Sequence, residues 1–330
     1  MIPKFSVCIP TYNRASFLKR AMQSVINQDF SDFELVIVDD CSTDNTHDIA
    51  LEFDDARIRF FVNDQNLGLV GNWNRCLKLA NGEIIWILHD DDILETNALS
   101  NAARVFNSYK IDMLYGDSQA FSDEKSLESA STQKKVSKVS VYKPGKEAIL
   151  AIIRQGGVCS TVSIRKEVFL SVGGFDPQFC YSPDVEYYPR IAKGYPIAHT
   201  SEILAFRRSH KTRAMISTWQ NEDFYNQYSS VYDRILQYAM EVGVKSDEIL
   251  SEISTRPKRM ILSVIVPTLL QYGHRDLARK YLSLYKVQED SQKSLLKYIG
   301  LKLLIHFPTS LIRITIPLYK IMMYIMSRGT

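Results

Sequence analysis

The sequence predicts an α/β domain built on a mostly parallel central sheet flanked by helices, and two observations support this fold class. Up to about residue 120, short apolar runs typical of strands alternate with stretches in which apolar residues recur every three or four positions, as in helices. Alternation of this kind is the pattern of a doubly wound, Rossmann-like sheet. Polar residues also follow directly on each apolar run, and ligands bind outside the carboxyl ends of the strands in such sheets.

The expected elements follow one another with short connections. The second strand is expected to be buried on both faces, as parallel strands are. Strands are expected at residues 5–9, 33–38, 58–62 and 84–88, and helices at 15–27, 44–54 and 70–79. Residues 121–145 are rich in Ser, Lys and Glu and are expected to form a surface excursion. Beyond them, the pattern predicts in turn a helix, a strand, a glycine-rich turn, a helix and a strand at 146–154, 160–165, 172–176, 184–190 and 203–208.

Length and composition allow one sizeable domain with an appendage. The chain has 330 residues, 45% of them hydrophobic, and its pattern is helical from about residue 219, so we expect a first domain over 1–218 and a helical region over 219–330. A net charge of +3 gives no electrostatic reason to expect nucleic-acid binding. Five scattered cysteines without a Cys-x-x-Cys pair indicate free thiols in a reducing compartment, and the N-terminal apolar run of about six residues is too short for a signal peptide. We therefore expect a cytoplasmic protein.

An acidic cluster, Asp90, Asp91 and Asp92, follows the fourth strand. Three adjacent carboxylates repel one another, and at the end of a buried strand they destabilise the fold unless a cation neutralises them. Hard oxygen ligands suit Mg²⁺ or Mn²⁺, which complete their coordination shell with substrate phosphates and water. The alternative is a solvated acidic turn that caps the following helix. Because the other strands also end in polar residues, we favour the metal site.

Two further strand ends carry groups that suit a nucleotide. Asp39 and Asp40 follow the second strand, where a carboxylate can accept a hydrogen bond from a base N–H or a ribose hydroxyl. Capping of the next helix is the alternative for this pair. The first strand leads into Thr11, Tyr12, Asn13 and Arg14, which place an aromatic face, an amide and a guanidinium at a helix N-terminus. Such groups suit base stacking and phosphate contact, although Tyr12 alone fits ordinary packing equally well.

Two candidate residues lie further along the chain. Asp184 opens a helix after Pro183, and it can act as a general base that deprotonates an acceptor hydroxyl. Its alternative role is helix capping. We prefer Asp184 to Glu186 because it lies nearer the loop. His210 follows the last predicted strand among basic residues, where it fits either a metal or phosphate ligand or a surface histidine.

The C-terminal tail, residues 291–330, contains no Asp or Glu and has six Lys or Arg between apolar stretches. The apolar stretches are shorter than a membrane span, so the segment is typical of one that lies on an anionic membrane surface. Helices packed on the core and an interface between copies of the chain are the alternatives. The first reading places the protein peripherally on the inner face of the cell membrane.

Residues 5–14, 36–44, 66–68 with Asn74, and 88–92 together resemble successive motifs of the inverting family 2 glycosyltransferases with the GT-A fold. The resemblance covers roughly residues 5–215 and leaves the tail uncovered. It implies that Asp91 binds the metal, with Asp92 and His210 as further ligands, and that Asp184 is the general base. The residues expected to bind the donor are Pro10, Thr11, Tyr12, Asn13, Arg14, Asp39, Asp40, Asn66, Gly68, Asn74 and Asp90. The usual first Asp of the metal-binding motif is His89 here, and its part in the site stays open.

The resemblance implies a metal-dependent, inverting and non-processive glycosyltransferase. It would use Mn²⁺ or Mg²⁺ and move a sugar from a UDP- or dTDP-sugar to a hydroxyl of a glycan or lipid-linked acceptor, in polysaccharide, capsule or lipopolysaccharide synthesis. A catalytically silent nucleotide-sugar-binding protein is one alternative. A sugar nucleotidyltransferase is another, although it should carry a glycine-rich loop after the first strand, where this chain has Thr11 to Arg14.

Overall fold

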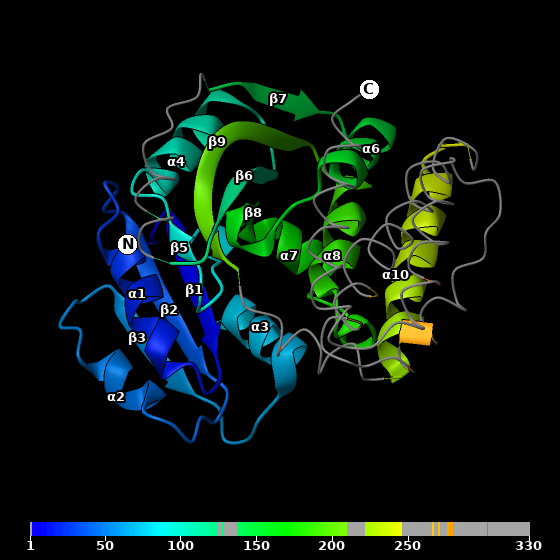
Figure 1. Cartoon of the computed structure of the whole chain (residues 1–330). Coiled ribbons are helices and arrows are strands. Elements are labelled where there is room, and N and C mark those ends of the chain that lie inside the picture. The colour runs from blue at the N-terminus through cyan, green and yellow to red at the C-terminus, as the bar shows by residue number, and fades with distance from the viewer. Residues whose placement is uncertain are drawn as a thin grey trace. The chain divides into compact units, whose positions relative to one another are not determined.

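The computed structural model describes residues 2–123, 127, 137–209 and 222–245, together with residues 266, 270, 276, 278, 279 and 302 (Figure 1). The predicted ligand His210 lies outside these residues, as does the basic tail apart from Lys302. The chain divides into two compact units, one of Met1–Ser209 with Val231–Ser246 and one of His210–Ser230 with Asp247–Thr330. Among the described residues, no helix has the length and apolar character needed to cross a bilayer.

The first unit is built on one mixed sheet in the order β3-β2-β1-β4-β8-β6-β9-β5, with β7 paired to β9. The strands β3, β2, β1 and β4 run parallel to one another, whereas β8 is antiparallel to both β4 and β6. The predicted fold class, an α/β domain on a mostly parallel sheet, is therefore confirmed. The strands are β1 (Phe5–Thr11), β2 (Phe33–Asp39), β3 (Ile58–Val62), β4 (Ile84–Ile87), β5 (Ile93–Leu94), β6 (Met113–Phe121), β7 (Val139–Tyr142), β8 (Val162–Arg165) and β9 (Ile197–Arg208).

Helices cover both faces of the sheet, as the alternation of side chains along β1 requires. Val7 and Ile9 of β1 pack with Leu18 and Met22 of α1 in the main core. Cys8 points to the opposite face, where its Sγ lies 3.8 Å from the carbonyl oxygen of Cys76 in α3. The helices of the described chain are α1 (Ala15–Ile26), α2 (Thr46–Leu51), α3 (Gly68–Leu79), α4 (Ala98–Ser108), α6 (Lys146–Gln155), α7 (Lys166–Val172), α8 (Pro183–Ala192) and α10 (Glu222–Glu241).

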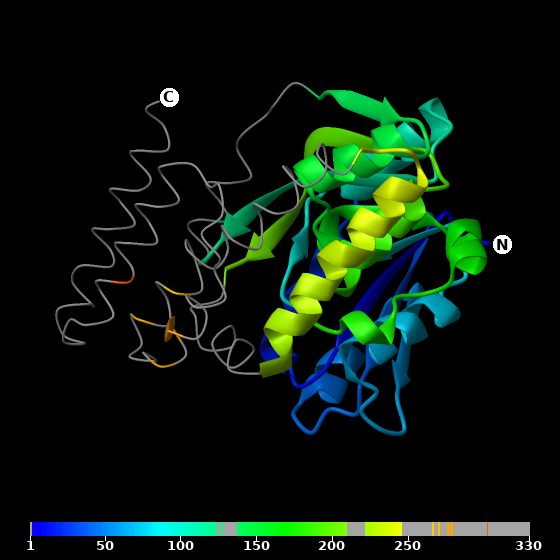
Figure 2. The ribbon, with the colours of Figure 1, turned by 90° about the vertical axis from the view of Figure 1, so that its right-hand side faces the viewer.

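The helices α8 and α10 are in contact with each other. From Val231 onward α10 belongs to the first unit, and it runs beside α8, as the views in Figures 1 and 2 both show. Tyr238 of α10 donates a hydrogen bond of 2.6 Å to Glu186 of α8. The second unit is described at few positions, of which Val266, Leu270 and Ala278 are buried.

The prediction of a surface excursion over residues 121–145 is wrong near both ends of this range, where the structure has strands. Phe121 is the last residue of β6, and Val139–Tyr142 form β7, an edge strand that pairs antiparallel with β9. An edge strand is covered on one side only, so its residues are half-buried or exposed and its sequence lacks a long apolar run. Its alternation of Val139 and Val141 with Ser140 was too short to separate it from a polar loop.

Candidate functional site

A cleft of about 570 Å³ opens at the carboxyl ends of β1, β2 and β4. Its lining brings together groups that are far apart in the sequence, from the first strand to the start of α8. The predicted site residues that line it are Pro10, Thr11, Tyr12, Arg14, Asp40, Asn66, Gly68, Asp90, Asp91 and Asp184. The rule that parallel strands present their ligand site at their carboxyl ends thus places most of the predicted residues together.

The acidic end of the cleft has a donor set that fits a divalent cation. One nitrogen of His89 and one carboxylate oxygen each of Asp91 and Asp92 lie within 4.8 Å of one another. His89 Nε2 is buried, and no described residue forms a hydrogen bond with it. Two carboxylate oxygens and an imidazole nitrogen suit Mn²⁺ or Mg²⁺, with open positions for phosphate oxygens. His89, whose part the sequence left open, therefore belongs to this cluster.

The two aspartates of this cluster differ in their surroundings. Asp91 lines the cleft, and its Oδ2 lies 3.3 Å from Nη1 of Arg14. Asp92 is 1% exposed, and its carboxylate accepts hydrogen bonds from the Ser160 hydroxyl at 2.5 Å and from the Arg208 backbone N–H at 2.9 Å. Asp92 thus anchors the acidic segment to β9 and to the turn before β8, whereas Asp91 lines the cleft.

The acidic cluster carries more negative charge than its surroundings neutralise. Burial, and next the neighbouring charge of Asp91, raise the pKa of Asp90 to about 6. Burial is also the main cause that raises the pKa of Asp92 above its ordinary value. Both shifts show that the ionised carboxylates are unfavourable in this environment, which a bound cation would relieve.

At the other end of the cleft, Asp40 is held by its neighbours at the ends of β2 and β3. Its Oδ1 accepts hydrogen bonds from Asn63 Nδ2 and from the Leu67 N–H, both at 2.8 Å. These bonds leave its other oxygen, Oδ2, as the natural acceptor for a ligand. Tyr12 also lines the cleft, and this residue is 46% exposed. A flat aromatic surface next to a fixed carboxylate suits a nucleobase.

Two predicted donor ligands, Asp39 and Asn13, do not line the cleft. The Asp39 carboxylate accepts hydrogen bonds from the Ser42 hydroxyl and N–H. Asn13 adopts a left-handed backbone with φ of 52°, accepts a hydrogen bond of 2.8 Å from the Thr43 N–H and donates its own N–H to Ser42 Oγ. These residues fix the loops after β1 and β2 to each other and so position Tyr12 and Asp40.

Asn74 also lies away from the cleft. Its side-chain amide bonds the backbone N–H and the carbonyl of Phe175, each at 2.9 Å, and thus holds the glycine-rich turn before α8. On α3 the cleft is lined by Leu69, Asn72 and Trp73 instead. Positions 68 and 69 share a helical face with 72 and 73, whereas 74 is turned away from them. Tyr181 and Pro183, which the sequence did not single out, complete the lining.

Asp184 reaches the cleft from the first turn of α8. Burial raises the pKa of its carboxyl group, and the nearby charge of His89 is the largest influence that opposes this shift. A carboxylate with a raised pKa is a stronger base than a solvated one. The cleft therefore brings together His89 and Asp91 of the acidic cluster, the side chains of Tyr12 and Asp40, and the carboxylate of Asp184.

Comparison with known proteins bears on these features. Residues 6–173 match the family model described as glycosyl transferase family 2. A curated relative is the GalNAc(5)-diNAcBac-PP-undecaprenol beta-1,3-glucosyltransferase of Campylobacter jejuni, which is 42% identical over 109 residues. This match covers 32% of the present chain and 35% of the Campylobacter enzyme, so it spans about a third of each.

Two solved structures share the fold. The structure of S. aureus TarS 1–349 in complex with UDP-GlcNAc superposes with a TM-score of 0.61 at 21% identity, over 90% of this chain and 89% of that chain. The mannosyltransferase PcManGT from Pyrobaculum calidifontis, in complex with GDP-Man and Mn²⁺, gives a TM-score of 0.54 at 16% identity, over 98% of this chain and 87% of that chain. At these identities the likeness concerns the fold.

Proposed function

Because the chain belongs to glycosyl transferase family 2 and is a glycosyltransferase, we propose that it moves a sugar from a UDP- or dTDP-sugar to an acceptor hydroxyl with inversion at the anomeric carbon. The GT-A fold expected from the sequence agrees with this membership. One observation carries the proposal. Asp40, Asp91 and Asp184, from three separate segments, line a single cleft of about 570 Å³, a volume typical of small-ligand sites.

A divalent cation fits the cluster of His89, Asp91 and Asp92. The donor atoms lie within 4.8 Å of one another, and the buried His89 Nε2 has no hydrogen-bond partner in the described part of the chain. When bound there, Mn²⁺ or Mg²⁺ supplies Lewis acidity that stabilises the negative charge of the diphosphate leaving group. The PcManGT structure contains Mn²⁺, which supports this choice of metals. His210 stays a proposed further ligand outside the described residues.

The protein's own side chains bind the donor and take the proton of the acceptor. Tyr12 and Asp40 bind the nucleobase, and Asp90 meets the ribose. Arg14, 3.3 Å from Asp91, places a positive charge beside the position of the diphosphate. As the acceptor hydroxyl attacks the anomeric carbon on the face opposite the nucleotide, its proton passes to the Asp184 carboxylate. The bond between the anomeric carbon and the diphosphate breaks in the same step, and the nucleoside diphosphate leaves.

For the acceptor, we propose a hydroxyl of a glycan or lipid-linked oligosaccharide. The name of the Campylobacter relative specifies an undecaprenyl-diphosphate-linked acceptor, and this supports a similar class for the present protein. The tail from 291 to 330 contains no Asp or Glu and has six Lys or Arg, which suits peripheral contact with the anionic cytoplasmic face of a membrane. Contact between copies of the chain is the alternative use of this tail.

A screen of nucleotide sugars tests the proposal. The full chain is incubated with UDP-, dTDP- and GDP-sugars, with Mn²⁺ or with EDTA, and both thermal stabilisation and nucleotide release are measured. We expect one nucleotide class to raise the melting temperature with Mn²⁺, and its sugar to be turned over in a Mn²⁺-dependent manner. Binding without turnover, also with lipid-linked acceptors, would point to a silent nucleotide-sugar-binding protein. Absence of binding by any nucleotide would contradict the assignment of the cleft.

A further inference from the structure

The helix that carries Asp184 is held from outside the cleft by a buried polar cluster. Glu186, two residues after Asp184 in α8, is 1% exposed. Its Oε1 accepts a hydrogen bond of 2.6 Å from the Tyr238 hydroxyl in α10, and its Oε2 accepts one of 2.8 Å from Arg190 Nη2. A buried carboxylate must have such partners, so Glu186 fixes the first turn of α8 to Tyr238.

Arg190 extends this cluster to the glycine-rich turn before α8. Its guanidinium donates hydrogen bonds to the carbonyl oxygens of Val172 at 3.1 Å and of Gly174 at 2.8 Å. The next residue, Phe175, is the one held by Asn74 of α3. The approach is close, because a Cβ on Gly174 would lie 2.2 Å from Asn74 Oδ1. Polar bonds therefore run without a break from α10 through α8 to the helix that lines the cleft.

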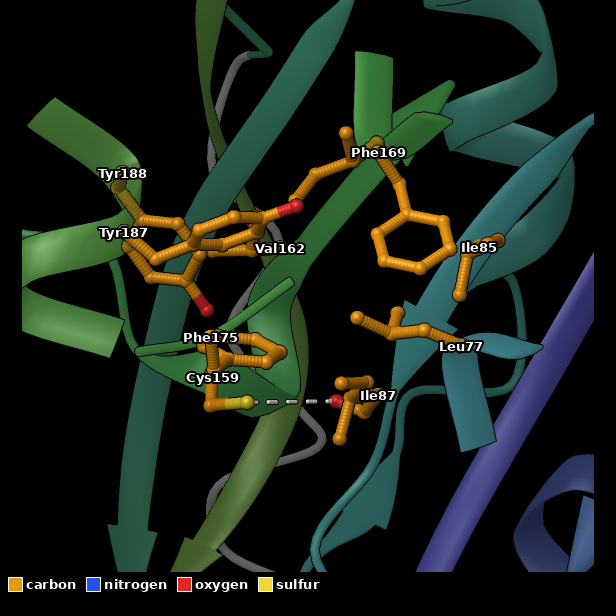
Figure 3. A pocket seen from close by; sticks show the side chains of 10 residues that line it. Leu77, Ile85, Ile87, Cys159, Val162, Phe169, Phe175, Tyr187 and Tyr188 are labelled. Atoms are coloured by element: carbon orange, nitrogen blue, oxygen red, sulfur yellow. Dashed lines mark hydrogen bonds between the residues drawn. The ribbon is translucent and has the colours of Figure 1, made fainter. Parts of the chain in front are cut away.

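On the inner side of α8, Tyr187 donates a hydrogen bond of 2.9 Å to the carbonyl oxygen of Gly173, and the apolar packing around it is incomplete. Between α8 and β4 lies an apolar cavity with room for about 20 Å³, and Figure 3 shows Tyr187, Tyr188 and Cys159 among the side chains around it. Side chains beside an empty space lose dispersion contacts on that side. Pro189 lies inside α8 and has no N–H to donate to the carbonyl four residues earlier. The bonds to Tyr238 and Arg190 are thus important for the position of the first turn.

Tyr238 lies within a continuous contact between α10 and the α8 region. Lys193 Nζ, just after α8, pairs with Glu241 at 2.7 Å and lies 4.9 Å from the centre of the Tyr238 ring. One turn before Tyr238, the guanidinium of Arg234 lies 5.6 Å from the Phe179 ring. Tyr238 itself is only 7% exposed, so its hydroxyl has little access to water as a substitute partner.

We propose that Tyr238 is a positioning residue for sugar transfer: its hydroxyl, through Glu186, sets the place of Asp184 in the cleft. The inference rests on the proposed role of Asp184 as general base. The nucleotide and cation sites are built from the ends of β1, β2 and β4 and from α3, and in the described part of the chain neither Tyr238 nor Glu186 forms a hydrogen bond with these elements directly. Loss of the Tyr238 hydroxyl should therefore change the rate of transfer and leave donor binding intact.

The test compares full-length Tyr238→Phe with wild type and with Tyr195→Phe. Tyr195→Phe is a matched control, because it removes a hydroxyl that bonds Ser171 at an exposed site away from the cleft. Turnover of the donor found in the screen is measured as nucleotide release, and UDP affinity is measured with Mn²⁺ by calorimetry. A misplaced catalytic group costs up to about a hundredfold in rate, and for this partial loss we expect kcat to fall about tenfold. The donor KM and the UDP Kd stay within about twofold of wild type.

A double-mutant cycle with Glu186→Gln completes the test. If both residues act through their shared bond, Tyr238→Phe combined with Glu186→Gln lowers kcat less than the product of the two single effects. Hydrogen exchange of the backbone amides between 184 and 192, where Pro189 has none, should be faster in Tyr238→Phe than in Tyr195→Phe with UDP and Mn²⁺ bound.

Two outcomes would overturn the inference. One is a kcat for Tyr238→Phe equal to that of Tyr195→Phe, and the other is a loss of kcat that is matched by a loss of UDP affinity. Asp184→Asn separates this failure from failure of the proposed function. Wild-type turnover in Asp184→Asn overturns the general base and the inference together. Lost turnover in Asp184→Asn with normal turnover in Tyr238→Phe overturns the inference alone.

Discussion

Arg14 Nη1 lies 3.3 Å from Asp91 Oδ2, so the loop after β1 and the acidic segment after β4 are joined by an ion pair at the cleft. Arg208 supports this pair from the far side, because its Nε donates to the Asp91 carbonyl at 3.2 Å while its guanidinium lies between the rings of Phe17 and Phe121. The carboxylate of Asp91, which we propose binds the metal ion, thus lies beside the guanidinium of Arg14, which we propose binds the diphosphate.

Replacement of Arg14 by Gln should affect the binding of the diphosphate but not the binding of the metal ion. We expect UDP affinity in the presence of Mn²⁺ to fall about tenfold or more, since a charge-assisted hydrogen bond to an anion is worth about 1.5–3 kcal/mol. Mn²⁺ affinity of the nucleotide-free protein should not fall, because Arg14 no longer competes for Asp91. Calorimetry measures both. Arg104→Gln, which breaks an exposed pair with Glu202, is the control, and an equal effect of the two changes on UDP binding would contradict the role of Arg14.

Asp92→Ala should act mainly on stability. The change leaves the Ser160 hydroxyl and the Arg208 N–H without their buried acceptor, and loss of such bonds to a charged group costs about 1.5–3 kcal/mol each. Urea denaturation of the metal-free proteins should show a larger loss of unfolding free energy for Asp92→Ala than for Asp91→Ala. The reverse order would mean that Asp92 is chiefly a ligand.

Asp90 gives a prediction for pH dependence. Burial and Asp91 raise its folded pKa to about 6, so the folded state binds more protons than the unfolded state between about pH 4 and 6. The free energy of unfolding should therefore fall as the pH rises through this window. Asp90→Asn removes the effect and should stabilise the metal-free protein at pH 7 by up to about 3 kcal/mol, with no gain below about pH 4. Denaturation curves in EDTA at pH 7 and below about pH 4 test this prediction. If Asp90→Asn raised the free energy of unfolding equally at both pH values, titration of Asp90 would not be the cause.

Asn74 can be tested against its neighbour in the cleft. Asn74→Ala removes both hydrogen bonds to Phe175, so we expect a loss of about 1–3 kcal/mol in stability with UDP affinity within about twofold. Leu69→Ala, at an exposed cleft position, should leave stability nearly unchanged. A large loss of UDP affinity in Asn74→Ala at unchanged stability would restore the nucleotide contact expected from the resemblance.

The sequence predicted the parallel strands and most cleft residues because both follow from local patterns. An apolar run predicts a buried strand, and the rule for strand ends then groups Thr11, Asp40 and Asp91 without knowledge of contacts. The same reasoning could not decide which face of α3 is turned toward the cleft. In the structure this face carries Asn72, and Asn74 lies outside the cleft. A shift of one or two residues along a helix changes the face completely.

Long-range partners were beyond local patterns. The bond of Asp92 to Ser160 spans 68 positions, and that of Glu186 to Tyr238 spans 52. Nothing in the neighbourhood of Glu186 distinguishes a buried, doubly bonded carboxylate from a solvated residue in the first turn of a helix. The structure supplies this difference, and with it the hydrogen bond that joins α10 to α8.

Asp91→Ala tests the central claim most directly, since this side chain lines the cleft and is the one proposed to bind the cation beside the diphosphate. The measurement is Mn²⁺-dependent nucleotide release from the donor selected in the screen, with thermal unfolding to verify that the variant is folded. A cation at the leaving group supplies several kcal/mol of transition-state stabilisation, so we predict a loss of at least about a hundredfold in kcat. A folded Asp91→Ala protein that turns over the donor at the wild-type rate would contradict the account.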